Sequence, residues 1–317
     1  MRPLFVLLAL SLAVPPAVAQ TPARPPITGV SHIAVYAANP ADAEHFYVHD
    51  IGLEKRPDPE NPAGARYYVN ALQFVEVLPL PPGAGKNRLD HLAYDTADAE
   101  ALRVYLAAHG VAVPPAVNNA SDGSRWFDVK DPEGNTVQFV QLPASPKKVV
   151  TDPAFHPIGR HIIHVGMLVR SRAAEDPFYR GLLGFRPYWY GGMKPGAVDW
   201  VSQQVPDGHD WLEYMLTGGT SNGTKAGGGI QDVSQKQLGV LNHVSIGVVN
   251  MEKAVTALDA GGRIETEHSP MQLGRDGKWQ FNLFDPDGTR VELMEYTPVE
   301  KPCCSPFTAP NPIAPAE

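Results

Sequence analysis

The alternation of apolar and polar residues predicts the same order of elements four times along the chain. Residues 30–36 alternate and contain β-branched side chains, which is typical of a half-buried strand. A helix is predicted to begin after Asn39-Pro40 and to end near Gly52, and three extended runs follow, up to residue 78. The order strand, helix, three strands restarts near residues 89, 161 and 241. One such unit cannot bury its sheet alone, so we expect the four units to pair.

Connectors rich in proline and glycine divide this repeat into two halves. The longest connector covers residues 143–159, and we place the domain boundary there. The prediction is an α+β protein of four βαβββ modules, with an N-terminal domain at 27–145 and a C-terminal domain at 159–298, two modules in each. A proline-rich tail follows at 299–317. Residues 218–229 are glycine-rich and are predicted to form a flexible loop inside the C-terminal domain.

The first residues have the composition of a secretory signal peptide. Arg2 precedes an apolar run that ends at Val14, and the small residues Ala17-Val18-Ala19 form a cleavage site. Pro15-Pro16 cuts the run well short of the roughly 20 apolar residues that a membrane span needs. We therefore predict a signal peptide at 1–19 and export to the periplasm or the medium.

Charge and cysteine content narrow the range of partners. The formal net charge is −8 and no basic run is present, which argues against nucleic acid and anionic membranes as partners. A small-molecule substrate and a monomer or homodimer are expected instead. The two cysteines, Cys303 and Cys304, cannot provide a disulfide framework. They could form a vicinal disulfide, bind a soft metal, pair with another chain or have no catalytic role in a tail of irregular coil.

Histidines and carboxylates recur at matching places in the four units. Each first strand carries a histidine, and each last strand carries a carboxylate or amide 44 to 49 residues further on. Only 11 of the 317 residues are histidine, so four at equivalent strand positions point to a shared role. On neighbouring strands such side chains converge, and imidazole with carboxylate suits Zn, Ni, Mn or Fe(II). The pairs are His32 with Glu76, His91 with Gln138, His164 with Glu213, and His243 with Glu292.

The repeated sequence motifs also resemble those of a known family. Phe46-Tyr47 recurs as Phe178-Tyr179, and the turn Asp131-Pro132-Glu133-Gly134 recurs as Asp285-Pro286-Asp287-Gly288. In these phrases the chain resembles the vicinal oxygen chelate superfamily, which includes glyoxalases, bleomycin-resistance proteins and extradiol dioxygenases, from about residue 29 to 297. The resemblance implies glyoxalase-like domains whose paired modules make cup-shaped sheets around a divalent metal.

The resemblance also implies which residues bind that metal. The C-terminal cup would use His164, His243 and Glu292, with Glu213 as a fourth ligand. The N-terminal cup offers a second set, His32, Glu76, His91 and Gln138. Neutral glutamine is a weaker ligand for a divalent cation than glutamate, so the C-terminal cup is the favoured site.

Two kinds of enzyme and one non-enzyme are compatible with this ligand set. With all four C-terminal ligands bound, the site resembles glyoxalase-like lyases and isomerases, in which Glu213 or Glu292 would move a proton. With His164, His243 and Glu292 alone, it resembles an Fe(II) extradiol dioxygenase. Asn282 stands where that pattern usually has tyrosine, which weakens ring cleavage, while export weakens a lyase that needs cytoplasmic thiol cofactors. A binding protein without metal is the third interpretation.

The residues before the last strands could contact the substrate. His268, Arg275 and Trp279 are the candidates, together with Lys278, although exposed hairpin residues would look the same in the sequence. The aromatic residues of 188–200 are interpreted first as core and only second as a wall of the site.

Overall fold

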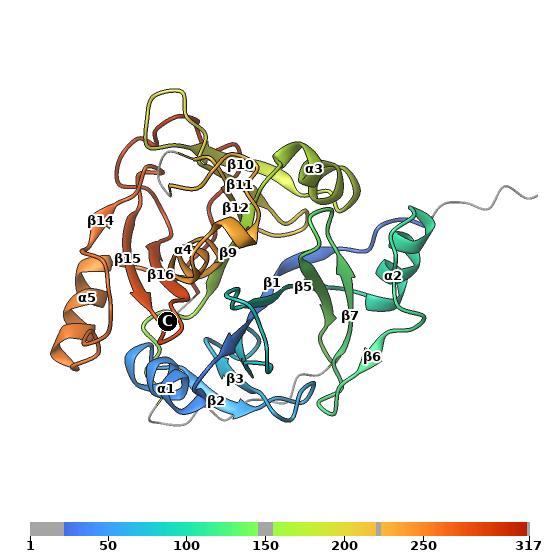
Figure 1. Cartoon of the computed structure of the whole chain (residues 1–317), viewed down its shortest axis with the longest axis horizontal. Coiled ribbons are helices and arrows are strands. Elements are labelled where there is room, and N and C mark those ends of the chain that lie inside the picture. The colour runs from blue at the N-terminus through green and yellow to red at the C-terminus, as the bar shows by residue number, and fades with distance from the viewer. Residues whose placement is uncertain (1–21, 145–154, 220–222, 316–317) are drawn as a thin grey trace, which may run out of the picture.

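The computed structural model describes residues 22–144, 155–219 and 223–315, and the signal peptide predicted at 1–19 lies outside them. The chain folds into two eight-stranded sheets, one formed by residues 27–141 and the other by residues 162–295. In Figure 1 the sheets curl as two half-barrels that meet along β1 and β9 near the centre of the view. The α+β class and the paired modules are confirmed.

The N-terminal sheet is built from two modules of strand, helix and three strands. Its elements are β1 (Ile27–Ala37), α1 (Pro40–His45), the π-helical turn η1 (Phe46–Asp50), β2 (Glu54–Pro57), β3 (Ala65–Tyr68), β4 (Phe74–Pro79), β5 (Leu89–Thr96), α2 (Ala99–Ala108), β6 (Asn118–Asn119), β7 (Arg125–Lys130) and β8 (Thr136–Gln141).

The C-terminal sheet repeats this order with one additional helix. Its elements are β9 (Ile162–Val169), α3 (Arg172–Asp176), η2 (Pro177–Leu182), β10 (Arg186–Gly191), β11 (Trp200–Gln204), β12 (Trp211–Leu216), the 3-10 turn η3 (Ile230–Asp232), α4 (Gln235–Leu241), β13 (His243–Val248), α5 (Met251–Ala260), β14 (Gln272–Leu273), β15 (Trp279–Phe284) and β16 (Arg290–Glu295).

Both sheets have the same topology. The strand orders are β2-β3-β4-β1-β5-β8-β7-β6 and β10-β11-β12-β9-β13-β16-β15-β14. The first strands of two modules pair antiparallel at the centre, and each pairs in parallel with the last strand of its own module. This arrangement places the four strands that carry the predicted ligands next to one another in each sheet.

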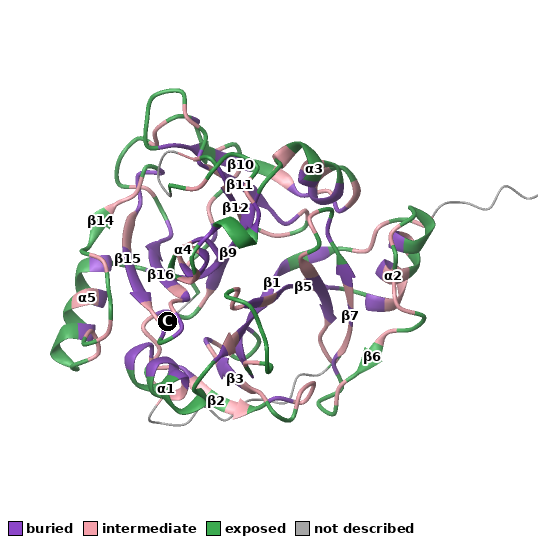
Figure 2. Cartoon of the chain, viewed as in Figure 1, coloured by how far each residue is buried: buried purple, intermediate pink, exposed green. Residues whose placement is uncertain are grey.

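Local sequence explains where the helices begin. The side chains of Asn39, Asp98 and Asn250 accept a hydrogen bond from a backbone N–H in the first turn of α1, α2 and α5. Helices α2 and α5 bury one face and expose the other, as the purple and green bands in Figure 2 show. Of the described helices, none is long and apolar enough to cross a bilayer.

The two repeated phrases meet across the boundary between the sheets. The hydroxyl of Tyr47 donates to Asp285 (3.1 Å), and the hydroxyl of Tyr179 donates to Asp131 (3.2 Å). Each aspartate also accepts backbone N–H groups of its own turn. Burial raises the pKa of Asp285 to about 6 and also raises the pKa of Asp131. The Phe-Tyr and Asp-Pro phrases therefore join the halves as well as shaping each module.

Two segments differ from the simple repeat. Helix α4, which the sequence analysis did not predict, packs Leu238 and Leu241 against Leu168 and Met215 on β9 and β12. Residues 299–315 lack regular secondary structure, as expected of this tail, yet they are bound to β10. Thr308 N donates to Tyr188 O, and Cys303 and Cys304 are joined in a disulfide.

Candidate metal centre

Two histidines lie side by side at the centre of the C-terminal sheet. Strands β9 and β13 are antiparallel neighbours, and Gly166 lies opposite His243. The Nε2 atoms of His164 and His243 are 3.0 Å apart, and both side chains are fully buried. A Cβ atom at residue 166 would lie 1.9 Å from Cε1 of His243, so this close approach requires glycine.

Two carboxylates approach the same point from the flanking strands. Glu292 lies on β16, which pairs with β13, and Glu213 lies on β12, which pairs with β9. Oε2 of Glu292 is 3.1 Å from Nε2 of His164 and 3.8 Å from Nε2 of His243. Oε2 of Glu213 is 3.5 Å from Nε2 of His243. The strand pairing thus brings together the four side chains that the sequence predicts as metal ligands.

The donor set fits a divalent cation. Nδ1 of His243 lies 3.1 Å from the carbonyl oxygen of Leu241, a contact that orients the ring with Nε2 toward the carboxylates. Oε2 of Glu292 is buried, and among the described residues its polar contacts are with the two histidines. Such an atom is costly to bury without a cation. Two imidazoles and two carboxylates suit Zn, Mn, Ni or Fe(II).

The two carboxylates differ in their electrostatic surroundings. Burial raises the pKa of Glu213 to about 8, and the charge of Glu292 adds to this shift. Burial would also raise the pKa of Glu292, but Arg290 and His164 outweigh it and lower the value to about 2. Burial lowers the pKa of both His164 and His243. Glu292 is therefore a fixed charge, whereas Glu213 can take up and release a proton.

A cavity of about 250 Å³ reaches Glu213 and Glu292. Its other lining includes Arg275 and Gln280 from the β14–β15 region and Ser202 from β11. An aromatic wall comes from β10, β11, β12 and the tail. The wall consists of Tyr188, Trp189, Trp200, Trp211 and Phe307.

The tail contributes to this wall through Phe307. The ring of Phe307 packs on Tyr188 with centroids 4.9 Å apart. Nζ of the buried Lys278 lies over both Trp211 (4.7 Å) and Phe307 (5.2 Å), and burial lowers its pKa to about 8. At the edge of the cavity a guanidinium nitrogen of Arg275 lies 2.9 Å from Sγ of Cys303. No sequence pattern indicated that the tail belongs to the site.

The predicted substrate-contacting residues occupy different places. Arg275 lines the cavity, but His268 and Trp279 are not among its lining residues. His268 is exposed and packs against Phe281, while Trp279 packs against the hydrophobic core. Asn282 lies beside Glu292 on the neighbouring strand, and its side-chain nitrogen donates to Ser269.

The N-terminal sheet brings together the equivalent set. Nε2 of His32 is 2.9 Å from Nε2 of His91, and Oε2 of Glu76 lies 3.7 and 3.5 Å from the two. As in the C-terminal sheet, a contact at Nδ1 orients one imidazole ring: Nδ1 of His91 is 2.7 Å from Asp90. Gln138, the amide of this set, donates to Glu60 (3.3 Å). These donors also fit a divalent cation.

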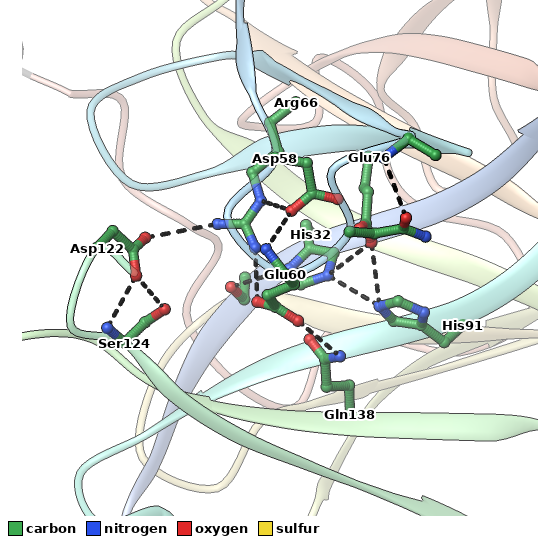
Figure 3. A network of polar contacts seen from close by, with 12 residues as sticks. His32, Asp58, Glu60, Arg66, Glu76, His91, Asp122, Ser124 and Gln138 are labelled. Carbon is green, nitrogen blue, oxygen red and sulfur yellow. Dashed lines mark hydrogen bonds and ion pairs between the residues drawn. The ribbon is translucent and has the colours of Figure 1, made fainter. Parts of the chain in front are cut away.

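An arginine distinguishes this N-terminal cup. The guanidinium of Arg66 contacts Asp58 (3.1 Å) and Glu60 (2.5 Å) and stacks over Phe74, as Figure 3 shows for the ion pairs. Burial raises the pKa of Glu76 to about 10, and the nearby Asp58 and Glu60 add to the shift. The adjacent cavity of about 570 Å³ is lined by Arg66 and Phe74 and does not reach Glu76 or either histidine.

Residues 161–293 match the family model of the Glyoxalase/Bleomycin resistance protein/Dioxygenase superfamily. The C-terminal domain thus carries the sequence pattern of that superfamily, and the N-terminal domain repeats its topology. The resemblance to the vicinal oxygen chelate superfamily is confirmed. No curated protein matches the sequence at a significant level.

Solved structures with the same fold include enzymes of both kinds considered above. A catechol 2,3-dioxygenase has a TM-score of 0.62 at 14% identity, covering 92% of this chain and 96% of that chain. The Mn(II)-bound glyoxalase of Novosphingobium aromaticivorans has a TM-score of 0.62 at 17% identity, covering 86% and 83%. Homoprotocatechuate 2,3-dioxygenase of Brevibacterium fuscum, in complex with 3,4-dihydroxyphenylacetate, has a TM-score of 0.60 at 15% identity, covering 87% and 82%. At these identities the likeness is one of fold.

Proposed function

We propose that the protein is a divalent-metal-dependent enzyme whose reaction takes place in the C-terminal cup, and that it transfers a proton on a small substrate with two neighbouring oxygens. The observation that carries the proposal is the cavity of about 250 Å³, which reaches Glu213 and Glu292. The corresponding cavity in the N-terminal half stops at Arg66 and Phe74. A substrate can therefore approach the two carboxylates of the C-terminal cup, whereas His164 and His243 lie behind them and do not line this cavity.

His164, His243 and Glu292 would hold the metal, with Glu213 at its edge. A bound divalent cation would supply Lewis-acid polarisation of a substrate oxygen. Glu213 lies 3.5 Å from His243 and contacts Ser202 (3.3 Å), so it borders the cavity rather than the centre of the histidine pair. From there its carboxylate would accept a proton from the carbon next to the chelating oxygen and return it to the neighbouring atom.

The aromatic wall and Arg275 suit a planar or unsaturated substrate with a negative charge. Aromatic faces pack against a flat substrate, and a guanidinium binds a carboxylate or phosphate in a bidentate manner. We also propose that the protein is exported, on the basis of its first 19 residues.

One observation favours the extradiol alternative. Glu292 lies within 4 Å of both histidines, whereas Glu213 lies 3.5 Å from His243 and only within 4.8 Å of His164. Fe(II) held by His164, His243 and Glu292 alone would have open positions. Glu213 would then serve as an acid or base beside a catecholic substrate of the kind named for the dioxygenases with the same fold.

The test begins with metal analysis of the purified full chain. Samples loaded with Mn(II), Ni(II), Zn(II) or Fe(II) are then assayed in two ways: deuterium uptake from solvent by α-hydroxy carbonyl compounds, and oxygen uptake with catechols. Metal-dependent deuterium uptake that His243→Ala abolishes supports the proposal. Oxygen uptake with Fe(II) selects the alternative, and a full-length protein that binds no metal overturns both.

A further inference from the structure

A second kind of histidine cluster lies outside both cups, on the turn that joins α1 to η1. Side-chain ligand atoms of His45, His49 and Asp50 all lie within 4.8 Å of one another. Nδ1 of His49 is 2.8 Å from Oδ1 of Asp50, and Nε2 of His45 is 4.0 Å from the same oxygen. The two imidazole rings stack with centroids 4.8 Å apart and planes inclined by 11°.

The π-helical turn explains why these side chains meet. Ile51 N donates to Phe46 O, five residues back, which widens the helix at this point. Residues 45, 49 and 50 consequently project from one side of the turn. Such widened turns occur often at functional sites.

The fold itself does not require these ligands. Turn η2 has the same hydrogen bonds, from Leu183 N to Phe178 O and from Phe185 N to Tyr179 O, matching those from Ile51 and Leu53 in η1. At the corresponding places, however, η2 has Pro177, Gly181 and Leu182. The Phe-Tyr pair is thus common to both turns, whereas the two histidines and the aspartate occur in η1 and not in η2.

Asp50 adds a buried carboxylate to the two histidines, and its Oδ1 atom is the one that faces them. Its side chain is only 4% exposed, and its Oδ2 atom has no hydrogen-bond partner among residues 22–144, 155–219 and 223–315. Arg263 lies nearby but donates to the backbone oxygen of Asp50 rather than to its carboxylate. A buried carboxylate that is only partly satisfied is costly, and a cation bound at Oδ1, the oxygen that faces both histidines, would offset its charge.

We propose that His45, His49 and Asp50 form a surface site for a borderline divalent cation of the zinc class. Two imidazoles and one carboxylate supply three protein ligands, and the exposed position leaves further coordination places to water. The side chains of His45 and His49 are 68% and 48% exposed, so a cation reaches them directly from solvent. This site is independent of the reaction proposed for the C-terminal cup.

The experiment titrates ZnCl₂ into the full chain after removal of metals with a chelator. The double variant His45→Ala/His49→Ala is expected to bind about one zinc ion fewer per chain than wild type, measured by calorimetry and by metal analysis after dialysis. Asp50→Asn is expected to weaken that site by more than about tenfold. His109→Ala, which removes an exposed histidine at the end of α2, is the matched control and should bind as wild type does.

A second readout separates this site from the cups. Histidines 32, 164 and 243 are fully buried and cannot reach a chelating resin, whereas His45 and His49 can. Untagged wild-type protein should therefore be retained on a zinc-charged column more strongly than the double variant. Equal zinc stoichiometry and equal retention of the two proteins would overturn the site, and unchanged affinity in Asp50→Asn would overturn the role of the carboxylate.

Discussion

The two cups have the same strand topology and each has a central pair of histidines, but different side chains lie beside the pair. In the C-terminal cup, Glu213 and Glu292 face a cavity with an aromatic wall. In the N-terminal cup, Arg66 forms ion pairs with Asp58 and Glu60. Arg66 and Phe74 line the neighbouring cavity, and the histidines and Glu76 do not. The difference teaches that ligand spacing alone does not identify a working site. The cavity that reaches Glu213 and Glu292, together with the exchange of Glu292 for Gln138 in the other set, is what favours the C-terminal cup in the proposed function.

The largest expected effect comes from removing one histidine of each pair. His243→Ala should lower metal-dependent turnover by at least about 10³-fold, because the metal loses a ligand at the place where the substrate binds. The matched variant His91→Ala should leave turnover unchanged. Steady-state kinetics with metal content measured on the same samples tests both. Loss of activity in His91→Ala with none in His243→Ala would transfer the reaction to the N-terminal cup.

The next comparison concerns the carboxylates of the last strands. Glu213→Gln keeps the shape of the side chain but replaces one acceptor oxygen by an amide NH2 and cannot accept a proton from carbon, so kcat should fall by about 10²–10⁴-fold. Glu76→Gln is the control in the other cup, where no substrate is expected. Deuterium exchange at the substrate carbon reports the step itself. Full exchange in Glu213→Gln would remove this residue from the proposed mechanism.

A smaller effect is expected from the wall that the tail provides. Phe307→Ala removes a half-buried ring that packs on Tyr188 at the cavity, and aromatic pairs contribute about 0.5–1.5 kcal/mol. We expect KM to rise by about 3- to 10-fold with little change in kcat. Ile313→Ala, at an exposed position of the same tail, should have no effect. A KM unchanged in Phe307→Ala would show that substrate does not touch this wall.

Sequence patterns predicted the ligand pairs because strand alternation and module repetition are local properties. Glu292 lies between the core residues Val291 and Leu293, so its direction could be read from alternation. Arg66 and Phe307 could not be recognised in this way. Their roles depend on contacts with Glu60 and Tyr188, and local periodicity carries no information about such partners. Helix α4 follows the glycine-rich loop, and its role likewise depends on distant partners, Leu168 and Met215.

Two equivalent hydrogen bonds across the boundary between the halves should contribute nearly equal amounts to the free energy of unfolding. Tyr47→Phe and Tyr179→Phe each remove one hydrogen bond to a buried aspartate, Asp285 or Asp131. Hydrogen bonds to charged groups contribute about 1.5–3 kcal/mol, so each variant should lose that much free energy of unfolding in urea titrations at pH 7. A loss in one variant alone would mean that the two contacts are not equivalent.

A further expected effect is a change in how stability depends on pH. Burial raises the pKa of Asp285 to about 6 in the folded protein, whereas an unfolded aspartate titrates near about 4. Between these values the folded state binds more protons than the unfolded state. The contribution of this group to the free energy of unfolding therefore increases as pH falls from about 6 to 4 and is lost as pH rises through about 6.

Asp285→Asn removes this contribution without changing the size of the side chain. The difference in free energy of unfolding between wild type and Asp285→Asn should shift in favour of wild type by up to about 1.4 kcal/mol for each pH unit below 6. Urea titrations of both proteins at pH 7, 6 and 5 measure the shift, and the slope common to both proteins cancels. A difference that stays constant with pH would mean that the turn aspartate is ionised throughout, with its donors outweighing the cost of burial.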